Sequence, residues 1–131
     1  MSASEAVQAA LVAALNGHAA LATAVSGVFD GPPARAAYPY VAIGESLTAD
    51  WSHKSGRGRE HRLAITIWDD GESAARLHGL MAEAETAIET MARDLDGHRV
   101  VSLVFLRSRI LRDADGPWAG LIEYRARTLE D

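Results

Sequence analysis

The five histidines of this 131-residue chain are the side chains best suited to chemistry, because imidazole serves as a metal ligand and as a general base. Their positions match no short metal-binding motif such as HExxH: His18, His53, His61, His78 and His98. His53 and His61 flank a polar segment, where a metal pair is one interpretation and a solvated loop is the more common one. We therefore predict no metal site.

Nucleophiles and paired carboxylates are equally scarce. The sequence has no cysteine, which excludes thiolate nucleophiles, disulfides and cysteine-ligated metal clusters. No serine lies in a GxSxG motif, and GRG at 56–58 is neither a Walker A loop nor GxGxxG. Asp69 and Asp70 are expected to end a strand and cap a helix, with Asp70 as the cap. We predict no catalytic or cofactor-binding residue, no cofactor and no enzymatic activity.

A basic segment at 53–62, HKSGRGREHR, is the most unusual stretch of the chain. It has one acidic residue and four basic ones, which are Lys54, Arg57, Arg59 and Arg62. Trp51 precedes it, and large aromatic residues beside mobile segments often become buried at interfaces. These features predict a contact with a polyanion or with an acidic partner surface, whereas the plainer alternative is a solvated loop.

A second group of arginines, Arg107, Arg109 and Arg112, follows an apolar strand pattern at what we take to be alternate positions. The facing strand carries Glu123, so some cross-strand ion pairs are expected, and these stabilise a sheet only weakly. An exposed strand end of this kind is a candidate for subunit contacts or for added β-strands.

The elements that would position these residues are two helices and four strands. Ser2 begins a capping box and an N-terminal helix to about Leu15. A long helix at about 72–95 follows from apolar residues spaced three and four apart. The strands are expected at these ranges: 40–47, 63–68, 100–111 and 118–129.

The predicted fold is therefore α+β, in the order helix, strand, strand, helix, strand, strand. A mostly antiparallel four-stranded sheet would pack against the long helix and the N-terminal helix. The segment 48–62 is expected to be a long flexible loop. Residues 100–106 are expected to be buried on both faces.

Composition supports one domain, 1–131, because the chain is 48% hydrophobic and 24% charged. No apolar run approaches the ~20 residues of a membrane-spanning helix, and the first residues do not resemble a signal peptide. The formal net charge of −5 argues against a duplex-DNA binder that acts by neutralising phosphates.

Seven segments, taken in order, resemble the tail-terminator or tail-completion proteins of long-tailed, siphovirus-like phages and gene transfer agents. They span nearly the whole chain: VFDGPP (28–33), YPYV (38–41), DWS with GRG (50–52, 56–58), HRL (61–63), IW (67–68), GHRVVSL (97–103) and LRDADG (111–116).

This resemblance implies a structural virion protein that forms a ring, usually a hexamer. The ring would cap the tail tube, stop its polymerisation and meet the head–tail connector or stopper protein. DNA would pass through the lumen only as cargo, and no membrane or cofactor is implied. Such a protein is assembled in the bacterial cytoplasm and resides in the particle, at the junction of head and tail.

The residues alone leave two other functional classes open. One is a small nucleic-acid-binding module that uses the basic segment 53–62. The other is a small α+β enzyme or ligand-binding dimer with a pocket between sheet and helix, for which the sequence offers no set of convergent polar groups.

Overall fold

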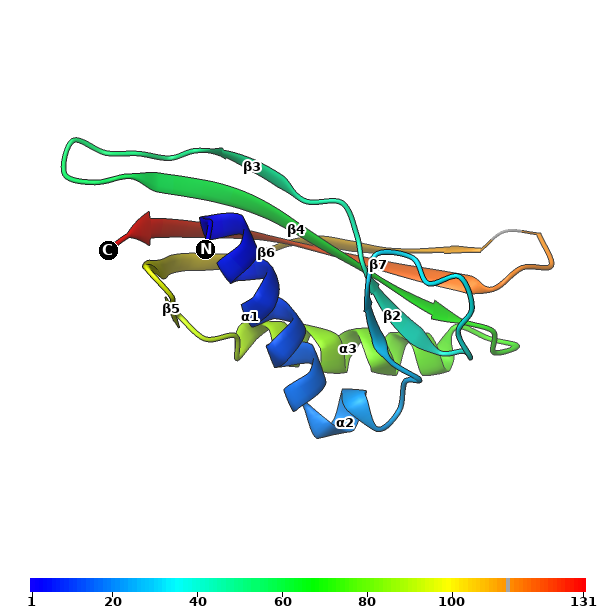
Figure 1. The fold of residues 1–131 in the computed structure, drawn as a ribbon. Coiled ribbons are helices and arrows are strands. Elements are labelled where there is room, and N and C mark those ends of the chain that lie inside the picture. Colours follow the sequence, from blue (N-terminus) through cyan, green and yellow to red (C-terminus); the bar gives the residue numbers. More distant parts are fainter. Residues whose placement is uncertain (113) are drawn as a thin grey trace.

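A seven-stranded sheet dominates the computed structural model, which describes residues 1–112 and 114–131 (Figure 1). The helices are α1 (Ala3–Gly17), α2 (Ala19–Ala22) and α3 (Ala75–Glu89). The strands are β1 (Val28–Asp30), β2 (Tyr40–Ile43), β3 (Leu47–Asp50), β4 (Gly58–Asp69), β5 (Asp94–Leu95), β6 (His98–Arg112) and β7 (Trp118–Glu130).

The strands lie in the order β1-β2-β4-β7-β6-β5, and β3 also pairs with β4. β4 is long enough to pair with β3 along its first half and with β2 along its second half. Among the strand pairs of the described residues, β1 and β2 are parallel and all the others are antiparallel. The sheet curls like half of a barrel, and all three helices lie on one of its faces (Figure 1).

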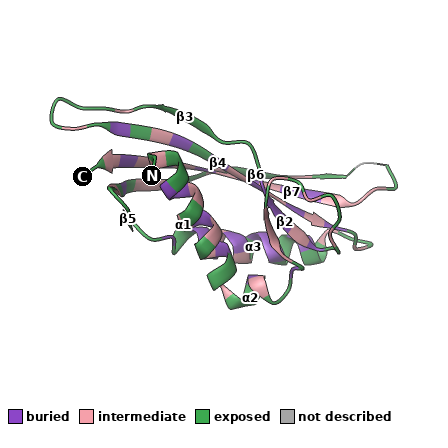
Figure 2. Cartoon of the chain, in the orientation of Figure 1, coloured by how far each residue is buried: buried purple, intermediate pink, exposed green. Residues whose placement is uncertain are grey.

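The core lies between that face and the helices. Every second residue is buried from His61 to Asp69 in β4 and from Gly120 to Thr128 in β7, while the residues between are more exposed (Figure 2). This is the period of two expected of a sheet covered on one face. α3 buries the matching stripe of Leu77, Leu80, Met81, Ala84, Ala87 and Ile88.

Two predicted local features are confirmed. The Ser2 hydroxyl accepts a hydrogen bond from the Glu5 amide at 3.1 Å, as a helix N-cap should. Ile122, Tyr124 and Ala126 face the core, as their alternation along 118–129 predicts.

The predicted four-stranded sheet against a long helix is wrong. α3 ends at Glu89 rather than near residue 95, because the chain turns there while the apolar spacing continues. Met91 is buried in the turn and Leu95 belongs to β5, so a core-facing stripe outlasts the helix. β1, β3 and β5 are two to four residues long, too short for a hydrophobic period to reveal.

Much of the predicted loop at 48–62 is also paired strand. β3 and the start of β4 form a hairpin with Thr48 opposite His61 and Asp50 opposite Arg59. Residues 100–106 are not buried on both faces either, since only Val100 among them is buried. β6 pairs with β5 at Asp94–Leu95 and is otherwise an outer strand among the described residues.

β6 also contains two irregularities. Its pairing with β7 skips Val101 and Leu106, which places a bulge at each position. The stretches between and after the bulges, from Ser102 to Phe105 and from Arg107 to Arg112, pair regularly with β7.

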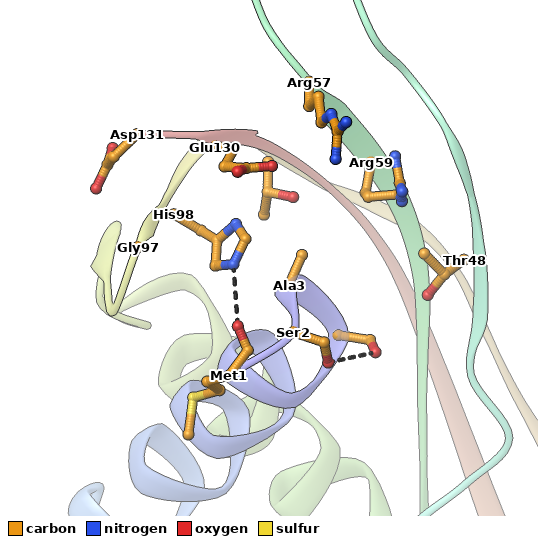
Figure 3. Close-up of a pocket in the computed structure, with 12 residues that line it drawn as sticks. Met1, Ser2, Ala3, Thr48, Arg57, Arg59, Gly97, His98, Glu130 and Asp131 are labelled. Atoms are coloured by element: carbon orange, nitrogen blue, oxygen red, sulfur yellow. Dashed lines mark hydrogen bonds between the residues drawn. The ribbon is translucent and has the colours of Figure 1, made fainter.

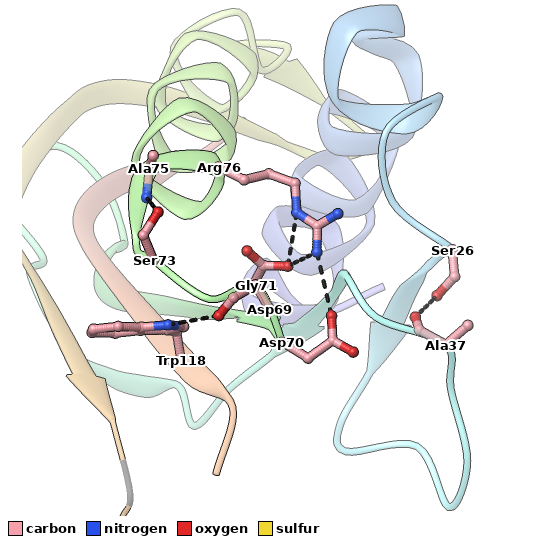
Figure 4. A network of polar contacts seen from close by, with 9 residues as sticks. All are labelled: Ser26, Ala37, Asp69, Asp70, Gly71, Ser73, Ala75, Arg76 and Trp118. Atoms are coloured by element: carbon pink, nitrogen blue, oxygen red, sulfur yellow. Dashed lines mark hydrogen bonds and ion pairs between the residues drawn. The ribbon is translucent and has the colours of Figure 1, made fainter. Parts of the chain in front are cut away.

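The start of α3 is held by an ion pair rather than by the predicted cap. Asp70 does not cap the helix, whose N-cap position is Ala74 and carries no side-chain hydrogen bond. Instead Arg76, in the first turn, bonds the buried carboxylate of Asp69 and lies 3.3 Å from Asp70 (Figure 4). The Trp118 indole donates to the Gly71 carbonyl at 3.0 Å beside them, which ties β7 to the same turn.

Candidate assembly interfaces

The β3–β4 hairpin holds the predicted residues Trp51 and Lys54. His53 and Gly56 bond each other through their backbones, so Lys54 is exposed at the tip of a tight turn. Trp51 stacks edge-on against His53, with ring centroids 4.4 Å apart, and the Arg127 guanidinium lies 5.1 Å from its ring centre. Trp51 is therefore held against the body of the protein rather than free in a loop.

Arg57 and Arg59 line a cleft of about 540 Å³ at the end of the molecule where the two termini meet (Figure 3). Across it lie the start of α1 and His98, whose Nε2 is 3.3 Å from the Met1 carbonyl oxygen. Glu130 and Asp131 also line the cleft, so its charge is mixed. The Arg59 guanidinium also forms an ion pair with the Asp50 carboxylate, 3.3 Å away.

His61, one of the two histidines considered for a metal pair, is buried in the sheet. Its ring nitrogens lie 3.2 Å from the Thr48 hydroxyl and 3.0 Å from the Thr128 hydroxyl. Burial, with smaller effects of Arg59 and His98, lowers the pKa of His61. Among the described residues no group of three or more acidic or histidine side chains could hold a metal ion.

The face of the sheet without helices gathers most of the remaining predicted arginines. Residues directly opposite each other on neighbouring strands point to the same face. By this rule Arg62 on β4 and Arg107 and Arg109 on β6 share the face of Arg125 and Arg127 on β7. Only two acidic residues of these three strands, Glu60 and Glu123, lie on this face, so it is positive although the chain carries −5.

Ion pairs occupy part of this face. Arg107 bonds Glu123, and this hydrogen bond lowers the pKa of the Glu123 carboxyl. Glu60 lies 3.0 Å from Arg127 and 3.7 Å from Arg125. Arg62 and Arg109 are exposed and form no ion pair within the described part of the chain.

Two of the predicted groupings are not formed. Arg112 points to the other face from Arg107 and Arg109, since it lies three residues beyond Arg109 on a regular strand. Its guanidinium stacks on Trp118, 4.7 Å from the ring centre. Arg59 and Arg62 likewise lie on opposite faces of β4, so the basic segment is not one patch.

Sequence reasoning missed the exposed apolar residues of two strands. β6 carries Val101, Val104, Phe105 and Leu111, and β3 carries Leu47. These strands lie at opposite edges of the sheet. The exposed residues at 101–105 resembled core in the sequence because they belong to a mostly apolar run. Only the strand order shows that no other strand of the described residues covers them.

Comparison with known proteins gives this arrangement a context. A sequence family described as tail completion protein gp17 matches residues 9–129. The chain belongs to this family. A chain in the virion of a native gene transfer agent particle is 30% identical, with 98% of each chain covered and a TM-score of 0.75. The gp17 protein of bacteriophage SPP1 has the same fold, with 23% identity over 95% of this chain and 89% of that one, and a TM-score of 0.65.

A search of curated proteins found no match. The family nevertheless confirms the predicted resemblance and makes this chain a tail completion protein, a structural component in the tail of a phage or gene transfer agent virion. None of the helices in the described residues combines the length and apolar character needed to cross a membrane.

Proposed function

We propose that this tail completion protein forms a closed ring of identical subunits, a hexamer, which caps the tail tube and stops its polymerisation. The ring then presents its other side to the head–tail connector, and DNA passes through its lumen as cargo. The role is structural and uses no cofactor.

One observation supports the ring most directly. The sheet has unpaired edges on opposite sides, at β3 and at β6, and both expose large apolar residues. Two different apolar edges on one subunit favour a head-to-tail contact between subunits. Such contacts close into a ring when the rotation from one subunit to the next divides a full turn evenly. The hexameric number and the connector partner rest on the family resemblance.

The basic face supports a second part of the proposal. Its arginines would meet an acidic surface of the tail tube protein, the connector or the next subunit, because complementary charge orients protein partners. The competing function, nucleic-acid binding through 53–62, requires Arg57, Arg59 and Arg62 to act together, whereas Arg59 and Arg62 point to opposite faces.

Native mass spectrometry of the purified protein, and electron microscopy of particles made without it, test the proposal. We expect a closed oligomer, in solution or on isolated tails, and tail tubes of uncontrolled length or without heads when the protein is missing. A chain that stays monomeric both free and on tails, with tails of normal length in its absence, would overturn the proposal.

A further inference from the structure

Two open stretches of the sheet edge, one at β3 and one at β6, are short and exposed. All four residues of β3 are exposed, and among the described residues β3 pairs only with β4. β6 is covered by β5 at His98 and Arg99, and from Val101 onward its outer edge pairs with nothing in the described chain. Unpaired edges of this kind are templates for a strand from another chain.

The strand directions allow these two edges to join. β4 and β6 both run antiparallel to β7, so they point the same way, and β3 runs antiparallel to β4. If a second copy continues the sheet head to tail, its β3 therefore lies antiparallel to the first copy's β6. No reversal of either subunit is needed.

The pairing register also brings the two edges to the same level. Leu47 is opposite Arg62, Arg62 is opposite Arg125, and Arg125 is opposite Val104. One row thus crosses four strands on the helix-free face and ends in an exposed apolar residue on each side. Leu47 is 66% exposed and Val104 is 40% exposed.

The adjacent rows are compatible with the same contact. Ala49 and Ser102 end the next row on the same face, and both are small. Thr48 and Leu103 end the row between, on the helix side. With these rows aligned, Leu47, Thr48 and Ala49 lie opposite the regular part of β6 between its bulges, and only Asp50, the last residue of β3, lies opposite the bulged Val101.

We infer that β6 of one subunit adds β3 of the next subunit to its sheet, antiparallel, with Val104 opposite Leu47. The occupant of both edges is a second copy of this chain. The inference rests on the proposed ring and specifies the contact that builds it. Burying two apolar side chains against each other stabilises the pair, and the backbone bonds of the added strand supply the rest.

The absence of native cysteine allows a direct test by disulfide formation. Leu47→Cys and Val104→Cys are introduced together, and a mild oxidant is added to the assembled protein. Within one chain the two residues are three strand spacings apart, about 14 Å, which is too far for a disulfide. Any disulfide therefore joins different subunits.

We expect a ladder of covalent species that ends at the number of subunits in the ring. When the single variants Leu47→Cys and Val104→Cys are mixed, each chain carries one cysteine, so oxidation should yield covalent dimers and nothing larger. The second pair Thr48→Cys and Leu103→Cys covers the other class of antiparallel site, because bonded and non-bonded pairs alternate along the strands. Leu47→Cys with Leu111→Cys is the matched control, since Leu111 is 47% exposed on the same face but lies at the far end of β6.

The outcomes separate this inference from the proposed function. Rings that form but show no cross-link with either of the first two pairs overturn the strand contact and leave the ring intact. Cross-linking only through Leu111 assigns another register and also overturns it. A protein that is monomeric both in solution and on isolated tails overturns the strand contact and the proposed ring together.

A substitution without cysteine gives an independent measurement. Val104→Lys places a charge where the added strand would pack, a device that natural edge strands use against pairing. We expect subunit association to weaken about tenfold or more, while Leu111→Lys changes it less than about threefold. Equal effects of the two variants, with both folded by circular dichroism, would overturn the strand contact.

Discussion

His61 illustrates how one residue changes meaning between sequence and structure. In the sequence it stands beside lysine and arginine residues in a polar segment, which indicates a solvated position. In the structure it lies on the helix side of β4, buried between two threonine hydroxyls. Burial and the nearby positive groups lower the pKa of His61, which favours the neutral imidazole over the imidazolium.

This burial predicts an acid-sensitive fold. Since the folded pKa of His61 is lowered, its contribution to stability is complete above the unfolded value of about 6.5 and is lost as pH falls from there towards the folded value. The loss is at most about 1.4 kcal/mol per pH unit within that window. Urea unfolding measured between pH 7.5 and pH 5 checks it.

His61→Asn should flatten this pH dependence, while His78→Asn, at an exposed position on α3, should leave it unchanged. A wild-type protein whose free energy of unfolding does not fall over this range would contradict the assignment.

At the scale of elements, the alternation of side chains along each strand decides which residues share a face of the sheet. Buried residues alternate with more exposed ones from Gly120 to Thr128 of β7, so its core residues and the outward direction of Arg125 and Arg127 could be predicted. The short strands could not, because three or four residues do not show a period. β6 could be predicted as a strand but not as an edge, because its position depends on the order of strands rather than on its own residues.

The packing of α3 on β7 offers a sharp test of the fold. A Cβ on Gly120 would lie 2.6 Å from the Met81 sulfur and 3.0 Å from Leu77 Cδ1, so the helix approaches the sheet closely there. Gly120→Ala should lower the free energy of unfolding by about 1–3 kcal/mol through overpacking.

Gly79→Ala is the matched control, because nothing lies within 4 Å of its added Cβ in the middle of α3. We expect it to raise stability by about 0.5–1 kcal/mol through helix propensity. Chemical denaturation compares the two variants, and an equal response in both would show that the close approach is absent.

At the scale of the whole molecule, positive charge is concentrated on one face of the sheet. The helix-free face carries arginines in excess, whereas the chain as a whole is acidic. This polarity could not be read from composition, since it requires three strands distant in sequence to lie side by side. The family resemblance, in contrast, could be recognised in the sequence, because its seven short motifs keep their order along the chain.

Assembly should be visible in hydrogen exchange. If the open edges pair between subunits, amides in β3 and in 102–105 of β6 gain protection in assembled tails relative to the free protein. Amides at the centre of β7, which already pair on both sides, should not change. Equal protection of the β3 and 102–105 amides in the two states would contradict the strand contact.

The two bulges of β6 have a consequence for fidelity. An open-edged sheet can stack its copies with any stagger and grow into a fibre, but Val101 and Leu106 bracket a window of four residues. A slip of one residue turns Leu47 to the opposite face. A slip of two puts Leu47 opposite the bulged Leu106 or Thr48 opposite the bulged Val101, whereas in the inferred register only Asp50, the last residue of β3, lies opposite a bulge. The irregularities therefore favour a single register between neighbouring subunits, and a single register is what a structure of fixed circumference requires.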